Sequence, residues 1–173
     1  MSERALVTGA GHRIGRAMAL GLARRGADVV VHYASSEGPA REVVDEITAM
    51  GRIAAPLQAD LLDEAQCETL VARAADALGG PLSILINNAS IFEYDTIATA
   101  TRESWDRHVG SNLRAPFVLS QKFAAQALGV GSDSAGEPCA TGVIINMIDQ
   151  RVRKLTPEFM TYTIAKMGLW AMT

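Results

Sequence analysis

The chain has 173 residues, of which 49% are apolar and 20% are charged, and its formal net charge is −3. This is the composition of one globular domain and excludes a disordered chain. The mild charge, with no run of basic residues, argues against nucleic acid or an anionic membrane surface as a partner. The two cysteines, Cys67 and Cys139, form no CxxC pair, so neither a disulfide framework nor a metal site is predicted.

The apolar runs of the chain are short. The run near the N-terminus is too short for a signal-peptide core of roughly 7–15 residues. No run reaches the ~20 residues that span a bilayer. A cytoplasmic protein is therefore expected.

Strand-like and helix-like segments alternate along the chain. Residues 5–8 form the first predicted strand, which leads into a glycine-rich turn and a helix that Gly26 ends. Asp63, with Gln66 three residues later, is predicted to cap the helix before the fourth strand. The strands after the first are predicted at residues 29–32, 53–60, 83–87 and 143–147.

A long helical region, roughly residues 102–128, separates the last two strands. Pro116 lies inside this region and predicts a break near Asn112. Residues 129–141 are rich in glycine and serine, and a mobile loop is expected there. The repeated strand–helix–strand units predict one α/β domain, residues 1–173, with a doubly wound (Rossmann) parallel sheet covered by helices on both faces. Ligands then belong at the carboxyl ends of the strands.

The turn after the first strand reads "TGAGHRIG" (residues 8–15). Gly9 and Gly11 let the backbone turn tightly and approach a pyrophosphate, whose charge the helix N-terminus meets. Gly15 lets the helix and the sheet pack closely. This strand–turn–helix arrangement predicts a nucleotide site.

Four motifs in order resemble those of the short-chain dehydrogenase/reductase family. The turn resembles the TGxxxGxG motif, with Arg13 where the middle glycine is usual. The run "NNAS" (residues 87–90) resembles the family's NNAG, and Tyr162 and Lys166 match its YxxxK. Asn112 matches the asparagine of the active-site tetrad. The resemblance covers the whole chain and implies an oxidoreductase that uses a nicotinamide cofactor.

The second strand ends in a stretch that indicates the type of cofactor. NAD enzymes usually place an acid there, about 20 residues past the glycines, to bind the ribose 2′-hydroxyl. Here the stretch reads "VHYASSE" and has no acid before its last residue. It offers the hydroxyls of Tyr33, Ser35 and Ser36, with the cation of Arg13 on the neighbouring turn. These groups suit a 2′-phosphate dianion, so NADP(H) is predicted over NAD(H); the alternative for Arg13 is a solvated arginine at a helix start.

The resemblance implies further cofactor contacts. Asp60 and Leu61 resemble the family's adenine-contacting pair, and the alternative for Asp60 is a helix N-cap. The full set of predicted cofactor-binding residues is Gly9, Gly11, Arg13, Ile14, Gly15, Tyr33, Ser35, Ser36, Asp60, Leu61, Asn88, Ala89, Ser90 and Lys166.

Tyr162 and Lys166 lie four residues apart and so share one face of a helix. A free phenol titrates near pH ~10, and a nearby ammonium lowers that pKa. The resemblance makes Tyr162 the catalytic proton donor. It implies that Lys166 holds the nicotinamide ribose and tunes the tyrosine, and that Asn112 places a water near the lysine.

Asp149 stands thirteen residues before Tyr162, where the family normally has a serine that binds a substrate carbonyl. A carboxylate accepts hydrogen bonds, and it repels the charge that develops on a carbonyl oxygen. It is better suited to a substrate whose nitrogen is protonated during hydride transfer, such as a C=N bond in a heterocycle.

Asp149 and Arg13 narrow the resemblance to the pteridine reductases. Their pattern is TGxxxRxG, an "HY…S" stretch, NNAS followed by a phenylalanine, and an aspartate in the serine's place. The chain has all four, as "TGAGHRIG", "HYASS", "NNASIF" and "NMID". By that resemblance Ser90 contacts the cofactor and the pterin, and Phe92 stacks on the pterin ring opposite the nicotinamide. Ordinary packing at the edge of a loop is the alternative for Phe92.

The predicted function is an NADPH-dependent reductase that transfers hydride to a pterin-like C=N bond. One alternative is a short-chain reductase of a carbonyl or 3-oxoacyl substrate, and another is a catalytically silent NADP-binding sensor or scaffold. A homo-oligomer, a tetramer by family analogy, is expected. Family members run further, through another strand and a helical lid. A longer natural protein is therefore expected, with a truncated product as the alternative.

Overall fold

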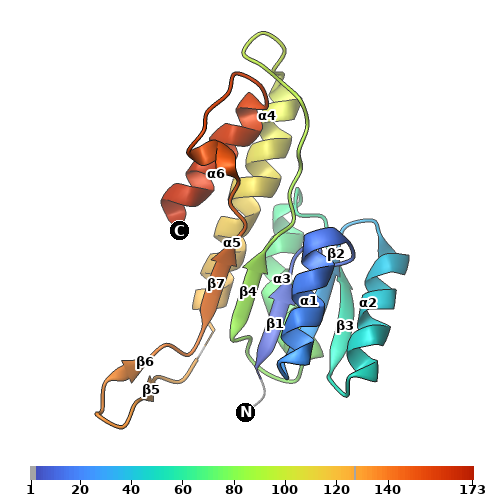
Figure 1. Cartoon of the computed structure of the whole chain (residues 1–173), viewed down its shortest axis with the longest axis vertical. Helices are drawn as coiled ribbons and strands as arrows, with labels where there is room; N and C mark the ends of the chain where they lie inside the picture. The colour runs from blue at the N-terminus through green and yellow to red at the C-terminus, as the bar shows by residue number, and fades with distance from the viewer. Residues whose placement is uncertain (1–2, 127) are drawn as a thin grey trace.

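The computed structural model describes residues 3–126 and 128–173. Its main sheet has five parallel strands in the order β3-β2-β1-β4-β7 (Figure 1). The strands are β1 (Arg4–Val7), β2 (Asp28–Tyr33), β3 (Ala54–Gln58), β4 (Ile84–Asn87) and β7 (Val143–Asn146). The predicted parallel sheet is confirmed. The strand order reverses between β1 and β4, and a ligand crevice is expected at the carboxyl ends of these two strands.

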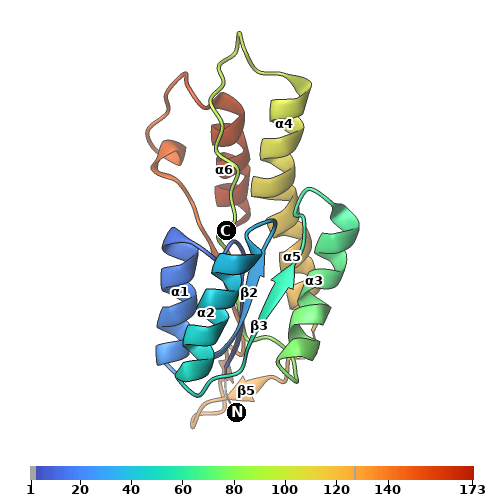
Figure 2. The same cartoon turned by 90° about the vertical axis from the view of Figure 1, so that its right-hand side faces the viewer.

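Helices cover both faces of the sheet. Figure 2 shows α1 and α2 on one side and α3 and α5 on the other, which confirms the doubly wound architecture. The helices α4 and α6 pack against each other and extend past the carboxyl ends of the strands (Figure 1). The helical segments are α1 (Arg13–Arg24), α2 (Glu37–Ala49), α3 (Glu64–Ala77), α4 (Arg102–Val109), the π-helical η1 (Gly110–Arg114), α5 (Ala115–Ala124), the 3-10 turn η2 (Gln150–Val152) and α6 (Met160–Met172).

Alternate residues of the central strands are buried in opposite layers. Leu6, Val30 and Leu85 pack with α3 and α5. Val7 and Val29 pack with α1 and α2. Because both faces are covered, these strands read as unbroken apolar runs, and burying each large side chain contributes about 2 kcal/mol.

The predicted break near Asn112 is confirmed, because η1 separates α4 from α5. Pro116 lies in the first turn of α5 and has no N–H for the bond that an α-helix would send to the carbonyl of Asn112. Such π segments frequently lie at functional sites. The helix α5 ends at Ala124, short of the predicted residue 128, and residue 127 lies outside the described residues.

Residues 129–141 form the predicted loop between α5 and β7, but this loop contains a short hairpin that was not predicted. The side chain of Asp133 closes a turn, because its Oδ1 accepts from the backbone N of Ala135 (2.8 Å) and of Glu137 (3.0 Å). The turn joins a short antiparallel hairpin of β5 (Gly131–Ser132) and β6 (Pro138–Cys139). The mobility of this segment stays a prediction.

Asp63 caps α3 as predicted. Its Oδ1 accepts from the backbone N of Ala65 (2.9 Å) and of Gln66 (3.3 Å). The Gln66 side chain donates to Oδ2 of Asp63 (2.9 Å) and accepts from the backbone N of Asp60 (2.8 Å). Asp60 itself accepts from the backbone N of Leu62 (2.9 Å) and does not cap the helix, so the N-cap alternative for Asp60 is wrong.

Three observations on the described residues bear on function classes. No described helix is long and apolar enough to cross a membrane. No described group of three or more His, Cys, Asp or Glu side chains could hold a metal ion. Both cysteines are free, Cys67 in the core and Cys139 on the surface.

Replacing Asp63 by alanine should lower the free energy of unfolding by about 1 kcal/mol, because two N–H groups of α3 lose their acceptor. Urea unfolding followed by circular dichroism measures this change. The matched variant Asp63→Asn keeps an acceptor and should lose less than about 0.5 kcal/mol. An equal loss in both variants would show that the charge near the helix N-terminus matters more than the cap.

Candidate active site

The turn between β1 and α1 has no space for side chains at two of its glycines. Gly9 has a φ of +62°. A Cβ at Gly15 would lie 2.2 Å from the carbonyl oxygen of Gly9 and 2.6 Å from Nδ2 of Asn88. The turn is therefore packed so closely that it needs glycine at both positions, as expected of a glycine-rich turn that holds a pyrophosphate.

Thr8 and Asn88 join this turn to the loop after β4. The hydroxyl of Thr8 accepts from the backbone N of Asn88 (2.9 Å) and of Ala89 (3.0 Å). The side-chain amide of Asn88 donates to the carbonyl oxygens of Thr8 (2.8 Å) and Gly9 (3.1 Å). Thr8 was not among the predicted site residues, although it opens the "TGAGHRIG" motif.

His32 supports the turn from β2 and was likewise absent from the predicted site. Its Nδ1 accepts from the backbone N of Gly9 (3.0 Å), and its Nε2 lies 3.0 Å from the carbonyl oxygen of Ala59. A carbonyl only accepts, so the ring proton lies on Nε2. Burial lowers the pKa of His32 to about 4, so the ring is neutral at pH 7.

Two hollows lie along the carboxyl ends of the strands and share Gly9, Ala89 and Ser90. The first has a volume of about 420 Å³, and its lining includes the predicted cofactor residues Ser35, Asp60 and Leu61. The second has a volume of about 520 Å³, and its lining includes Arg13, Ile14, Gly15, Asn88, Phe92, Asp149 and Tyr162. The structure therefore brings most of the predicted cofactor, substrate and catalytic residues to one edge of the sheet.

Four predicted cofactor residues do not line these hollows. Gly11 packs against the start of α2, where a Cβ would lie 3.3 Å from the backbone N of Ala40. Tyr33 is half-buried against the layer of α1 and α2, and Ser36 occupies the N-cap position of α2. Lys166 lies deeper in the protein and is only 3% exposed. Contacts of these four residues with a cofactor stay predictions.

Arg13 adopts a backbone conformation that glycine favours. Its φ is +48°, and its side chain is exposed beside the second hollow. The left-handed region costs an ordinary residue about 1–2 kcal/mol, which explains why a glycine is usual at this place in the motif. Strained residues of this kind cluster at functional sites. The chain thus has the Arg13 guanidinium at a position where the backbone conformation of an arginine is unfavourable.

Tyr162 and Asp149 form the centre of the site. The Tyr162 hydroxyl donates to Oδ2 of Asp149 at 3.1 Å. Burial, followed by the charge of Asp149, raises the pKa of Tyr162 to about 12. The prediction that the ammonium of Lys166 lowers this pKa is therefore wrong for this structure, because burial and the carboxylate dominate. A phenol of high pKa stays protonated at pH 7, which is the state that a proton donor needs.

Lys166 lies near Tyr162 and is held by a backbone carbonyl. Its Nζ donates to the carbonyl oxygen of Met147 (2.8 Å) and lies 5.8 Å from the centre of the Tyr162 ring. Burial lowers the pKa of Lys166 to about 8, against the opposing effect of Asp149. Asn112 is fully buried, and its amide binds the backbone of Ile91. The predicted role of Asn112, placing a water near the lysine, stays a prediction.

Phe92 belongs to an aromatic cluster that the motifs did not reveal. Its ring stacks on that of Phe159, with centres 4.2 Å apart, and meets the Tyr162 ring edge-on at 4.7 Å. The guanidinium carbon of Arg151 lies 4.6 Å from the Phe159 ring centre. The backbone N of Arg151 donates to Oδ1 of Asp149 (2.8 Å). Phe159, with a φ of +55°, and Arg151 thus extend the predicted site.

Comparison with known proteins places the chain in a family. The sequence model of the family described as "short chain dehydrogenase" matches residues 3–173. The chain belongs to this family. Among short-chain dehydrogenases, a "Short-chain type dehydrogenase/reductase" from Picea abies is 34% identical over 98% of this chain and 62% of its own length. The "3-oxoacyl-[acyl-carrier-protein] reductase FabG" of Staphylococcus aureus (strain Mu50 / ATCC 700699) is 32% identical over 100% of this chain and 66% of its own length.

A solved structure extends the comparison to the fold. The NADP complex of FolM, "Alternative dihydrofolate reductase 1" from Brucella canis, has a TM-score of 0.88 to this short-chain dehydrogenase and 36% identity. The match covers 99% of this chain and 65% of that one. It confirms the Rossmann fold, and its bound NADP agrees with the predicted cofactor. The chain spans between 62% and 66% of the length of these three proteins.

The free energy of unfolding should fall as the pH is lowered from 6.5 towards 4, because the unfolded chain binds a proton at His32 that the folded chain excludes. Each pH unit in this window removes up to about 1.4 kcal/mol. Urea unfolding at three or four pH values measures the slope. His32→Asn should flatten the slope, whereas His12→Asn, at an exposed residue of the same turn, should keep it. A slope unchanged in His32→Asn would assign the acid sensitivity to another group.

Proposed function

We propose that this chain is the cofactor-binding and catalytic part of an NADPH-dependent reductase that passes hydride to a C=N bond of a flat, pterin-like ring. The observation that carries the proposal is the hydrogen bond from the Tyr162 hydroxyl to Asp149 (3.1 Å), next to the Phe92 ring. A carboxylate in this position can accept from an amino or ring N–H group of a substrate, whereas it repels a developing oxyanion.

The residues at the strand ends fit NADPH, which supplies the hydride when it is bound. The narrow turn at Gly9 and Gly15 would hold the pyrophosphate at the start of α1. Arg13, in the lining of the second hollow, would offer a cation for the 2′-phosphate, and Ser35, in the lining of the first, would offer a hydroxyl. The NADP complex of the Brucella canis FolM, at 36% identity, supports this choice of cofactor.

Reduction of a C=N bond adds a hydride to the carbon and a proton to the nitrogen. Tyr162, with a pKa raised by burial to about 12, holds its proton at neutral pH and can deliver it. Asp149 receives the Tyr162 hydrogen bond on Oδ2 and that of the Arg151 backbone on Oδ1, so its orientation is fixed from two sides. A positioned proton donor contributes typically about 10²–10⁴ in rate, and most when its pKa lies near the working pH.

The stacked rings of Phe92 and Phe159, which we call the aromatic wall, favour a flat substrate. Phe92 lines the same hollow as Asp149 and Tyr162, and the stacked Phe159 supports its ring. An aromatic ring stacked on such a wall gains about 0.5–1.5 kcal/mol beyond its buried area. A flat heterocycle therefore gains from both the wall and the carboxylate, and an open-chain ketone gains from neither.

Reduction of a carbonyl or 3-oxoacyl substrate is the second candidate, and the similarity to the Staphylococcus aureus FabG supports it. The carboxylate of Asp149 beside Tyr162 argues against it, because the oxygen of a carbonyl becomes negative during hydride transfer. A catalytically silent NADP-binding scaffold needs no proton donor. The position of Tyr162 in the same hollow as Phe92 therefore argues against it.

NADPH oxidation by the intact protein tests the proposal. The substrates are a dihydropterin, a simple ketone and a 3-oxoacyl thioester. We expect kcat/KM for the dihydropterin to exceed the other two by at least about 100-fold, because the site pairs its polar groups only with the heterocycle. Turnover of the ketone or the thioester alone would contradict the pterin assignment.

The variant Asp149→Ser should lower kcat/KM for the dihydropterin by roughly 100-fold and leave ketone reduction unchanged or faster, because a hydroxyl can donate to a carbonyl oxygen. Steady-state rates with both substrates measure the switch. Asp133→Ser, in the turn of the β5–β6 hairpin, is the matched control and should change neither rate. Equal losses on both substrates in Asp149→Ser would remove the basis for the C=N assignment.

A further inference from the structure

The loop after β4 that carries Phe92, residues 90–95, is held by hydrogen bonds on both sides of that residue; we call it the Phe92 loop. Before Phe92, the Asn112 amide accepts from the backbone N of Ile91 (2.9 Å) and donates to its carbonyl oxygen (2.8 Å). The ring of Phe92 is itself 52% exposed. Its position therefore depends on the backbone that bears it as well as on its contact with Phe159.

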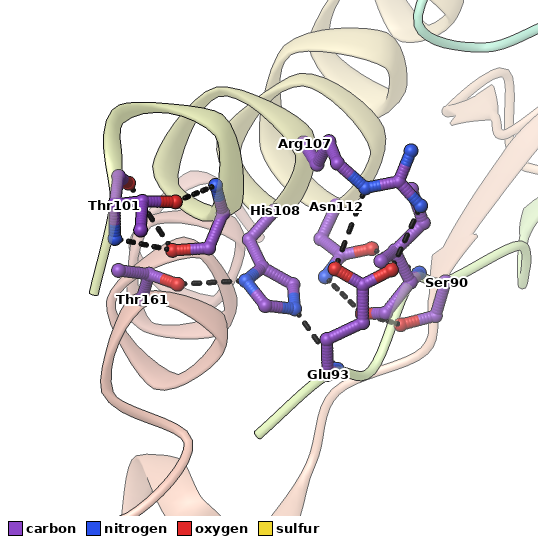
Figure 3. Close-up of polar contacts among 9 residues, drawn as sticks. Ser90, Glu93, Thr101, Arg107, His108, Asn112 and Thr161 are labelled. Atoms are coloured by element: carbon purple, nitrogen blue, oxygen red, sulfur yellow. Dashed lines mark hydrogen bonds and ion pairs between the residues drawn. The ribbon is translucent and has the colours of Figure 1, made fainter. Parts of the chain in front are cut away.

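Three buried side chains tie down the other side of the Phe92 loop. His108, on α4, accepts through Nε2 from the backbone N of Glu93 (3.1 Å), and its Nδ1 lies 2.6 Å from Oγ1 of Thr161 (Figure 3). The Thr161 hydroxyl donates to Oδ2 of Asp95, and the Thr161 backbone N donates to Oδ1 (3.1 Å). His108 and Thr161 are 0% exposed and Asp95 is 2% exposed.

The carboxylate at the end of this network sets the direction of each hydrogen bond. Asp95 only accepts, so the Thr161 hydroxyl donates to it and accepts from Nδ1 of His108. Nε2 of His108 then carries no proton and can accept from Glu93. Burial lowers the pKa of His108, although the charge of Asp95 acts to raise it. The ring is therefore neutral at pH 7. Burial would raise the pKa of Asp95, but hydrogen bonds from Thr161 and Ser104 lower it overall.

We propose that His108, Thr161 and Asp95 are positioning residues that set the distance between the Phe92 ring and the Tyr162 hydroxyl. Thr161 directly precedes Tyr162 on α6, so the network ties the proton donor's own helix to the Phe92 loop. The rings of Phe92 and Tyr162 lie 4.7 Å apart at 75°. A misplacement of about 1 Å at a reacting group can cost about 10²-fold in rate.

The polar character of the network supports this role. An apolar core of the same shape would be as stable or more so, because buried polar groups lose their hydration. A fully satisfied network instead permits one arrangement, since each donor has one acceptor at a set distance. His108 also packs edge-on to the Tyr162 ring, with centres 6.0 Å apart, so the network touches the proton donor directly.

The substrate class in the test rests on the proposed function, whereas the positioning itself does not. Thr161→Val keeps the side-chain shape and removes the hydroxyl, so Nδ1 of His108 and Oδ2 of Asp95 lose the partner that they share. The bonds from the backbone N of residue 161 to Asp95 and from that of Glu93 to His108 do not involve this hydroxyl. In the intact protein we expect kcat/KM for a dihydropterin to fall roughly 100-fold and that for a small open-chain carbonyl to fall less than about threefold. Thr161→Ser restores the hydroxyl and should return dihydropterin turnover to within about threefold of the wild type.

A second variant, Asp95→Asn, keeps the size of the side chain and replaces one acceptor oxygen by an NH₂ donor. If its amide N faces the Thr161 hydroxyl, that hydroxyl donates to His108, whose proton moves to Nε2 and opposes the N–H of Glu93. If it faces the Thr161 backbone, two donors meet there instead. The Phe92 loop must shift in either case. We expect hydrogen exchange at the amides of residues 91–95 to accelerate at least about tenfold, as in Thr161→Val.

Glu93→Gln is the matched control. It removes an exposed ion pair with Arg107 (2.7 Å) but keeps the backbone N–H that binds His108, so exchange and rates should stay within about twofold. Unchanged exchange at residues 91–95 in Thr161→Val would overturn the inference, and so would equal losses on ring and open-chain substrates. If the wild type reduces no dihydropterin, the proposed function fails, and the exchange rates alone decide the inference.

Discussion

The hydrogen bonds between Thr8 and Asn88 join the end of β1 to the end of β4, and both halves of the candidate site depend on them. On one side lies the turn at Gly9, the proposed pyrophosphate site. On the other lies the Phe92 loop with its aromatic wall. Because β1 and β4 are neighbours in a sheet buried on both faces, the same two paired strands position both halves of the site. A cofactor and a ring substrate would lie next to each other at the carboxyl ends of these two strands.

Much of this arrangement could be predicted from the sequence, because it depends on local chemistry. Buried parallel strands read as apolar runs, and a tight turn needs glycine at Gly9 and Gly15. Contacts between distant residues could not be predicted. Thr8 and Asn88 are 80 positions apart, and nothing local indicates that His32 supports the turn. The β5–β6 hairpin was missed because its glycine- and serine-rich composition concealed the turn that Asp133 closes.

The electrostatics of Tyr162 show the same limit. Spacing on a helix indicates that Lys166 is near, but it does not indicate how deeply either group is buried. Burial raises the pKa of the phenol and lowers that of the ammonium, and Asp149 adds to the first effect and opposes the second. The sign of the tyrosine shift therefore depended first on burial and then on the carboxylate of Asp149, and no motif specifies how deeply the phenol lies or how near the carboxylate is. Phe159 and Arg151 escaped prediction for a related reason, since they reach Phe92 only through the path of the chain between β7 and α6.

Arg13 occupies a left-handed backbone position that would suit glycine better. A single change to glycine would relax the turn and at the same time remove a cation from the lining of the second hollow. Under the proposed role of Arg13 in binding the 2′-phosphate, the stability of the turn and the selectivity for the cofactor favour different residues at this position.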